Sequence, residues 1–389
     1  MKVYLVLPLG AFHGWGVCGR NLLRELAGQV AVTHLWPDGD LGGGFDDLEA
    51  AYLRRFAMSS EERRRTLADP GVAVPGSVLQ SIRDHTMLPG GPYLRGSQTV
   101  GYTFFERDVL PESARRVVTD HYDLVVAGST WCEEILQRHG IPRTATILQG
   151  IDPQLFNPAA GEKQIFRDSF VVFSGGKLSL RKGHDIVIRA IKALQDRHRD
   201  VLFVHAWFNP WPATMQGLTG SPHIRCDLSG EDHLEITGNL LAANGVDLDR
   251  VISVPARSNA LMAKIYKNTD LGLFPNRCEG GTNLVLMEYM ACGKPVIASL
   301  GSGHRDILSC ENSRPIKTLG VAEIRHEGGL VTRWDEPDLD ETVEHLEWAY
   351  QNRDQLLPLG ERAAADLSKL TWRRAAGAWL KLLGRDGSE

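Results

Sequence analysis

The stretch 270–299 places a glycine-rich loop and a helix pattern between two short apolar runs. The first run, 270–275, suits a buried parallel strand, and the glycines that follow it cannot continue a strand. A helix is then expected, with Thr282 or Asn283 as its cap and Gly293 as its end. Parallel strands need a crossover of this kind. The stretch therefore restricts the chain to folds with a parallel sheet, which is the α/β class.

The glycine loop at the start of this helix also suits an anion. Backbone N–H groups and the positive end of a helix would point at one position there. Two carboxylates, Glu279 and Glu288, flank that position. A ligand that carries both phosphates and hydroxyls fits such a site, and a sugar nucleotide is one.

Short apolar runs alternate with amphipathic segments along most of the chain, which favours a parallel sheet covered by helices on both faces. The stretch 39–97 breaks this rhythm and is interpreted as an excursion from it. Strands are expected at 3–7, 30–36, 100–105, 124–127, 144–148, 170–173, 201–206, 251–254, 271–274, 296–298 and 330–331. Helices are expected at 17–27, 111–118, 130–139 and 185–194, with a final amphipathic helix at 370–383.

Composition narrows the function classes. At 389 residues the chain is long enough for two domains. A net charge of −5 and a pI near 6.2 argue against a general nucleic-acid or anionic-membrane binder. No apolar run approaches the length of a transmembrane helix. The six cysteines form no Cys-x-x-Cys pair, so no zinc site is expected, and reduced thiols favour a cytoplasmic protein.

A second glycine-rich turn follows the strand expected at 170–173. It reads Ser-Gly-Gly-Lys-Leu-Ser-Leu-Arg-Lys-Gly-His-Asp and contains Gly176 and three cations, Lys177, Arg181 and Lys182. A strand-to-helix turn with this composition is suited to phosphate.

Together the two turns resemble the donor site of GT-B glycosyltransferases, and they are closest to the retaining enzymes of glycosyltransferase family 4. In that family two glutamates separated by seven residues precede a helix that ends in Ala-x-Gly-x-Pro-Val. Here Glu279 and Glu288 are separated by eight residues, which we interpret as a one-residue insertion in the glycine turn. The resemblance covers nearly the whole chain.

The resemblance implies two Rossmann-like domains with a cleft between them and a C-terminal helix that returns to the first domain. We expect an acceptor-binding domain at 1–157, a nucleotide-sugar-binding domain at 158–369 and the returning helix at 370–389. The excursion at 39–97 would then lie near the acceptor cleft.

The resemblance also assigns roles in the expected donor site. Lys177 takes the position of a family arginine and Lys182 matches a family lysine, and both would hold the donor diphosphate. With the N–H groups of Asn283 and Leu284, they would stabilise the charge on the leaving oxygen. Arg181 would contribute to this or face solvent. Gly280, Gly281 and Thr282 would form the turn at the donor.

The two glutamates would bind hydroxyls, Glu288 on the nucleotide ribose and Glu279 on the donor sugar. The alternative for either is a structural role at a helix. The loop with Val254 would hold the base, and Arg257 would pair with the base or with a neighbouring acid.

On the acceptor side, Gly14 and Gly16 lie in a loop that would let backbone approach the diphosphate and the acceptor; a plain turn is the alternative. Glu106 stands near the position of a histidine in many family members. It would orient or deprotonate the acceptor hydroxyl, or bind a cationic acceptor. A structural ion pair with Arg107 or Arg115 is the alternative.

The sequence therefore predicts a retaining, metal-independent glycosyltransferase that uses a UDP- or GDP-linked sugar and needs no other cofactor. The acceptor would be a soluble small molecule, for instance one with an amino sugar, or a glycan; no nucleic-acid partner is expected. The alternatives are a sugar-nucleotide epimerase or phosphorylase on the same scaffold, or a binding module without turnover. An NAD enzyme is disfavoured, because no Gly-x-Gly-x-x-Gly follows the first strand. The sequence leaves the acceptor, the base and the oligomeric state open.

Overall fold

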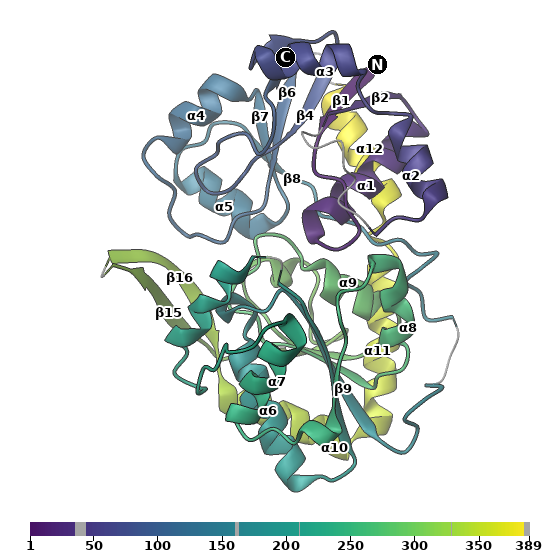
Figure 1. The fold of residues 1–389 in the computed structure, drawn as a ribbon, viewed down its shortest axis with the longest axis vertical. Helices are drawn as coiled ribbons and strands as arrows, with labels where there is room; N and C mark the ends of the chain where they lie inside the picture. The colour runs from purple at the N-terminus through teal and green to yellow at the C-terminus, as the bar shows by residue number, and fades with distance from the viewer. Residues whose placement is uncertain (36–43, 160–162, 210, 328, 385–389) are drawn as a thin grey trace. The chain divides into compact units, whose positions relative to one another are not determined.

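The computed structural model describes residues 1–35, 44–159, 163–209, 211–327 and 329–384. The chain forms two compact units. The first contains residues 1–152, 280–282 and 370–389, and the second contains residues 153–279 and 283–369. Each unit is built around a parallel sheet of six strands (Figure 1).

The first unit has the strand order β2-β1-β4-β6-β7-β8. Its sheet strands are β1 (Lys2–Val6), β2 (Ala31–His34), β4 (Ser77–Ser81), β6 (Thr99–Thr103), β7 (Leu124–Ala127) and β8 (Thr144–Thr146), and β3 (Val72–Ala73) pairs separately with β5 (Leu94–Arg95). Its helices are α1 (Gly14–Ala27), α2 (Asp47–Arg54), α3 (Ser60–Ala68), α4 (Ala114–His121), α5 (Thr130–Arg138) and α12 (Trp372–Leu383).

The interpretation of 39–97 as an excursion is wrong for its second half. Strand β4 lies in the middle of the sheet, between β1 and β6, and all five of its residues are buried. Its sequence, Ser-Val-Leu-Gln-Ser, lacks the continuous apolar pattern of a central parallel strand. Residues 39–43 of this stretch lie outside the described residues.

Helix α12 packs within the first unit, which confirms that the final helix returns there. The Trp379 ring is fully buried and meets Tyr102 of β6 edge to face, with 4.9 Å between the ring centroids. The Ser77 hydroxyl of β4 donates a hydrogen bond to the carbonyl of Leu383 (3.3 Å). The helix therefore covers the sheet whose strands come from the other end of the chain.

The second unit has the strand order β11-β10-β9-β12-β13-β14. Its sheet strands are β9 (Phe170–Gly176), β10 (Val201–Trp207), β11 (Val251–Ser253), β12 (Leu271–Phe274), β13 (Val296–Ser299) and β14 (Arg314–Ile316). Its α-helices are α6 (His184–Arg197), α7 (His233–Ala243), α8 (Met262–Tyr266), α9 (Leu284–Ala291), α10 (Leu339–Gln351) and α11 (Arg353–Leu367). Its 3₁₀ turns are η1 (Leu180–Lys182), η2 (Pro212–Thr214), η3 (Gln216–Gly220), η4 (Leu248–Arg250), η5 (Asn259–Leu261) and η6 (Ser302–Asp306).

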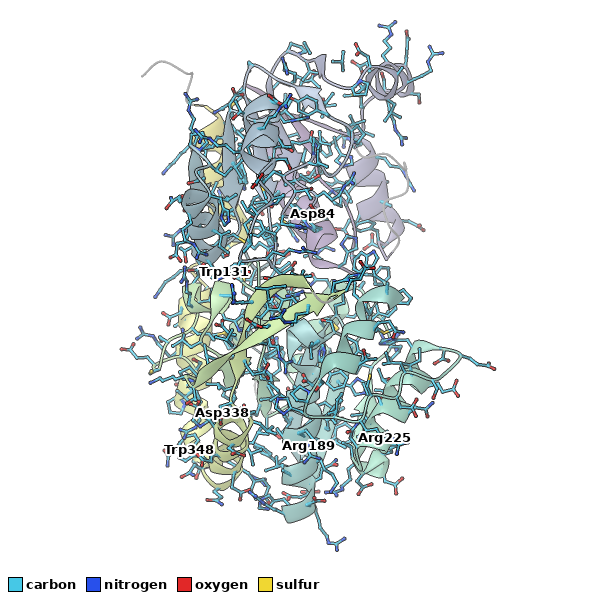
Figure 2. All side chains as sticks on the ribbon, turned by 90° about the vertical axis from the view of Figure 1, so that its left-hand side faces the viewer. Asp84, Trp131, Arg189, Arg225, Asp338 and Trp348 are labelled. Atoms are coloured by element: carbon cyan, nitrogen blue, oxygen red, sulfur yellow. The ribbon has the colours of Figure 1, made fainter. Side chains whose placement is uncertain are left out.

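Apolar helix faces cover this sheet. Val187, Ile191 and Leu194 recur at helical spacing on α6 and are buried against the sheet core. Helix α10 packs along α6 and is capped by Asp338, whose carboxylate accepts from the Glu341 N–H at 2.7 Å (Figure 2).

The strand expected at 330–331 does not belong to this sheet. Those residues lie in β16 (Gly329–Pro337), which forms an antiparallel hairpin with β15 (Leu319–His326). Figure 1 shows the hairpin as a separate ribbon of the second unit. The sixth sheet strand is β14, whose Pro315 is tolerated because β14 is an edge strand. In the described part of the chain, no helix has the length and hydropathy needed to cross a bilayer.

Candidate active site

The cationic turn lies at the carboxyl end of β9, next to the turn that follows β12. Residue Gly183 joins η1 to α6 with a positive φ of 68°. A Cβ at this position would lie 1.9 Å from the carbonyl oxygen of Pro275, just after β12. The absence of a side chain therefore lets the two turns approach, and this brings Lys182 beside Glu279.

Glu279 is the centre of a buried ion cluster. Its Oε1 lies 2.6 Å from the Lys182 ammonium and its Oε2 lies 3.2 Å from the Arg181 guanidinium. The amide of Asn276 also donates to the carboxylate. Burial raises the pKa of Glu279, but the two cations outweigh burial and hold it at about 2. The carboxylate is therefore ionised at neutral pH, and it pairs with two of the three cations that the sequence predicts at the diphosphate.

Asn283 extends this cluster to the start of α9. It stands at the N-cap position with a φ of 61°, and its side chain makes no capping bond to the helix. Its Oδ1 instead accepts from the Lys182 ammonium at 3.5 Å, and its amide N–H donates to Nε2 of His304 at 3.1 Å. Sequence reasoning named Asn283 as a possible cap and did not foresee either contact.

His304 is buried in η6, just beyond β13. Its Nδ1 donates to the carbonyl of Ser299 at 3.1 Å. Burial lowers the pKa of His304 to about 4, despite the opposing effect of Glu279. The ring is therefore neutral at neutral pH, with Nε2 as an acceptor.

Glu288 lies on α9, five residues after Asn283, and is buried. Its Oε1 accepts from the Asn259 amide at 2.5 Å, and its Oε2 accepts from the Tyr266 hydroxyl at 3.5 Å. Five residues span about 7.5 Å along a helix. The structure therefore places Glu288 on the same short helix whose start receives Lys182.

Arg277 is a buried residue of the site that sequence reasoning missed. Its guanidinium donates to both carboxylate oxygens of Asp185 (2.7 and 2.8 Å) and to both of Glu336 (2.7 and 2.6 Å). It also donates to the carbonyl of Leu180 at 2.7 Å, and its backbone N–H donates to the carbonyl of Arg181 at 2.8 Å. The Arg277 side chain thus connects the cationic turn with α6 and with the β15–β16 hairpin through hydrogen bonds. The available signal was an arginine two residues after an apolar strand run.

Lys177 occupies a different position in the same turn. Its ammonium lies 5.0 Å from the ring centroid of Trp211, which is 48% exposed. Gly176, at the end of β9, has a φ of 118°. Of the residues expected to hold the base, Val254 donates its N–H to the carbonyl of His205 (2.8 Å), and Arg257 is exposed.

Comparisons with known proteins agree with this architecture. Residues 169–319 match the model of the family described as Glycosyl transferases group 1. The match begins just before β9 and ends at the first residue of β15. HepE of Anabaena, in complex with UDP and glucose, aligns over 99% of both chains with a TM-score of 0.65 and 14% identity. A trehalose-6-phosphate structure from E. coli, bound with UDP-2-fluoro glucose, aligns over 99% of both chains with a TM-score of 0.64 and 13% identity. The chain has the GT-B fold.

Curated relatives confirm the resemblance to glycosyltransferases. The D-inositol 3-phosphate glycosyltransferase of Mycobacteroides abscessus is 26% identical over 235 residues, which are 58% of this chain and 44% of the relative. The GDP-mannose-dependent alpha-(1-6)-phosphatidylinositol dimannoside mannosyltransferase of Mycobacterium tuberculosis is 25% identical over 230 residues, which are 54% of this chain and 53% of the relative. The chain thus spans about half the length of the curated relatives it matches.

The remaining predicted residues of this GT-B chain belong to the first unit. Gly14 and Gly16 lie in the first turn of α1, not in a loop before it, because His13 caps the helix three residues earlier than expected; its Nδ1 accepts from the Gly16 N–H at 3.1 Å. A Cβ on Gly16 would lie 2.7 Å from backbone atoms of Gly10, so Gly16 is needed for the packing of α1 against the preceding loop. Glu106 is half-buried, three residues beyond β6.

The residues of the turn after β12 are assigned to different units. Gly280, Gly281 and Thr282 belong to the first unit, whereas Leu284, the first residue of α9, is buried in the second. Lys177, Arg181, Lys182, Glu279 and Glu288 all belong to the second unit. In the described residues, no group of three or more His, Cys, Asp or Glu side chains is arranged to hold a metal ion.

Proposed function

We propose that this protein is a retaining glycosyltransferase that moves a sugar from a nucleotide-diphosphate sugar to an acceptor hydroxyl. The buried cluster of Lys182, Arg181 and Glu279 at the start of α9 carries the proposal. It combines cations and the positive end of a helix with one ionised carboxylate. This set suits a ligand that has both phosphate oxygens and sugar hydroxyls.

In the proposed reaction, the bond from the sugar to the diphosphate breaks while the acceptor oxygen bonds to the same face of the sugar. The acceptor proton passes to the departing diphosphate oxygen. Negative charge develops on that oxygen, and the ammonium of Lys182 would stabilise it where it forms. We propose that Lys182, Arg181 and the start of α9 supply this positive charge without a metal ion.

The proposal also gives roles to the other side chains. Glu288 would accept hydrogen bonds from ribose hydroxyls and Glu279 from sugar hydroxyls. Lys177 would meet the diphosphate from beside Trp211. Two of the similar structures are complexes with UDP or a UDP-sugar, and one similar enzyme is GDP-mannose-dependent, which supports a UDP- or GDP-linked donor.

We propose a small molecule or a glycan as the acceptor, bound by the first unit. The half-buried carboxylate of Glu106 would orient the acceptor hydroxyl or bind an amino group. Asp46, Asp47 and Glu49, at the start of α2, favour a cationic acceptor such as an amino sugar.

Titration calorimetry with UDP and GDP, followed by turnover of their sugars, tests the proposal. The variant K182A should slow transfer by about tenfold to several hundredfold, since a charge-assisted hydrogen bond contributes about 1.5–3 kcal/mol. E288A should weaken nucleotide binding. K192A is the matched control, because Lys192 lies on α6, the helix that follows the turn of Lys182, but pairs with Asp196 at the surface.

The outcomes are distinct. If K182A and E288A bind and turn over like the parent, the site assignment is wrong. Conversion of the sugar nucleotide without any acceptor would indicate an epimerase or phosphorylase. Binding without transfer to any acceptor in a panel would indicate a binding module.

A further inference from the structure

A chain of three hydrogen bonds connects the backbone of β13 to the ammonium of Lys182. The carbonyl of Ser299 accepts from Nδ1 of His304 at 3.1 Å. Nε2 of His304 accepts from the Asn283 amide at 3.1 Å, and Oδ1 of Asn283 accepts from Lys182 at 3.5 Å. All four residues are buried, with at most 9% of their surface exposed.

The first bond in this chain fixes the direction of the others. A carbonyl can only accept, so the nitrogen of His304 that faces Ser299 must carry the proton. In the neutral ring the other nitrogen is then an acceptor. This acceptor nitrogen, Nε2, needs a donor, so the NH₂ group of Asn283 must face it. The amide oxygen of Asn283 then faces Lys182. The reverse amide orientation would place NH₂ against an ammonium, and oxygen against a lone pair.

The backbone of Asn283 supports a role for its side chain. Its φ of 61° lies in the left-handed region, where glycine is relaxed and where asparagine is among the better tolerated alternatives. An asparagine at an N-cap normally accepts a bond from the helix backbone. Here that bond is absent and both ends of the amide are used elsewhere.

Two side chains therefore contact the ammonium of Lys182. Glu279 lies 2.6 Å from it, and the Oδ1 atom of Asn283 lies 3.5 Å from it. A single contact would let the long side chain rotate about its partner, whereas two contacts fix the position of Nζ.

We propose that His304 is a positioning residue for Lys182, and that it acts through Asn283 so that the ammonium meets the leaving diphosphate oxygen of the donor. The inference rests on the proposed function and adds to it a residue that does not itself touch the donor. Misplacement of a charge-stabilising group affects the transition state more than the bound substrate. Loss of the chain should therefore lower kcat with little change in KM.

Three single variants separate this role from packing. H304L keeps the volume of the ring but removes the acceptor, and it should lower kcat by about threefold to tenfold, the range that follows from the net contribution of one hydrogen bond. H304Q can place a carbonyl oxygen where Nε2 lies and should stay within about twofold of the parent. N283G suits the backbone and removes the amide, so kcat should fall as in H304L.

Double variants test whether the residues act in series. H304L should have no further effect on kcat in the N283G background, and neither variant should have an effect in the K182A background. If the losses from H304L and N283G instead multiply, or if H304Q is as impaired as H304L, the positioning role is refuted. Thermal unfolding of each variant shows that it is folded, and affinity for inorganic pyrophosphate gives a second readout without turnover.

Failure of this inference differs from failure of the proposed function. If the parent turns over a nucleotide sugar and K182A is impaired, while H304L and N283G match the parent, only the positioning role falls. If the parent neither binds a nucleoside diphosphate nor turns over its sugar, the proposed function falls and this inference falls with it.

Discussion

Replacement of Arg277 by methionine should destabilise the second unit severely. The side chain is 1% exposed and donates to two carboxylates, Asp185 and Glu336. Asp185 is fully buried. Among the described residues, the donor that would remain to its carboxylate without Arg277 is the Ser221 hydroxyl (2.6 Å). An ionised carboxylate would then remain in the core without its counter-charge.

The expected loss is about 3–5 kcal/mol, the usual result of removing one partner of a buried ion pair. At about 2–4 °C per kcal/mol for a unit of this size, the Tm should fall by about 6–20 °C. Differential scanning calorimetry is the suitable assay, because it can resolve the unfolding of the two units. R277K should lose part of this stability, because lysine keeps the charge but not the planar fork.

R362M is the matched control. Arg362 also pairs with two acids, Glu311 and Asp366, but is about half exposed, so its loss should cost at most about 1 kcal/mol. The double variant R277M/D185L should recover part of the loss, since it removes the stranded charge. If R277M is no less stable than R362M, or if D185L does not restore stability, the buried-charge reasoning is refuted.

Two further predictions concern the same site. Because the pKa of Glu279 is about 2 in the folded chain and near 4.5 when unfolded, its ionised form should stabilise the fold by about 3 kcal/mol above pH 4.5 and lose about half of this by pH 3. The stability difference between the parent and E279Q in urea, measured from pH 7 to pH 3, should shrink accordingly; a difference that does not change with pH would contradict the assigned ion cluster. G183A should destabilise the chain by at least about 1–3 kcal/mol, because the residue has a positive φ and a Cβ would meet the carbonyl of Pro275 at 1.9 Å. G238A, in the middle of α7 with nothing near its Cβ, should instead leave stability unchanged or raise it, and equal effects of the two changes would show that the turn does relax.

Most of the fold could be predicted because apolar strand runs are short and sharply bounded by glycine or by charge. The expected strands at 124–127 and 271–274 agree residue for residue with β7 and β12. The strand β4 could not be found in this way, since Ser77, Gln80 and Ser81 look solvated in the sequence although they are buried between two strands. The Ser77 hydroxyl, for example, donates to the carbonyl of Leu383 near the other end of the chain, a contact that no local pattern reveals.

In the candidate site, too, some features could be predicted from the sequence and others could not. The cations and acids of the donor turns could be predicted from residue type and spacing. The partners of these groups could not, because Arg277, Asn283 and His304 reach them across separate crossovers. The spacing of Glu279 to Glu288 departs from the family pattern, and the carboxylate of Glu279 is the one that Lys182 and Arg181 contact.

The charges of the cluster are compatible with a carboxylate inside the proposed diphosphate site. One ionised Glu279 faces two cations, so the three side chains together keep one net positive charge. The start of α9 adds the equivalent of about half a positive charge. A diphosphate would still be attracted, while the carboxylate keeps Lys182 desolvated and oriented before the donor arrives. Removing Glu279 should therefore strengthen the binding of free pyrophosphate and at the same time slow transfer. Calorimetry and turnover of E279Q measure these two effects separately, and a parallel loss of both would show that Glu279 serves binding alone.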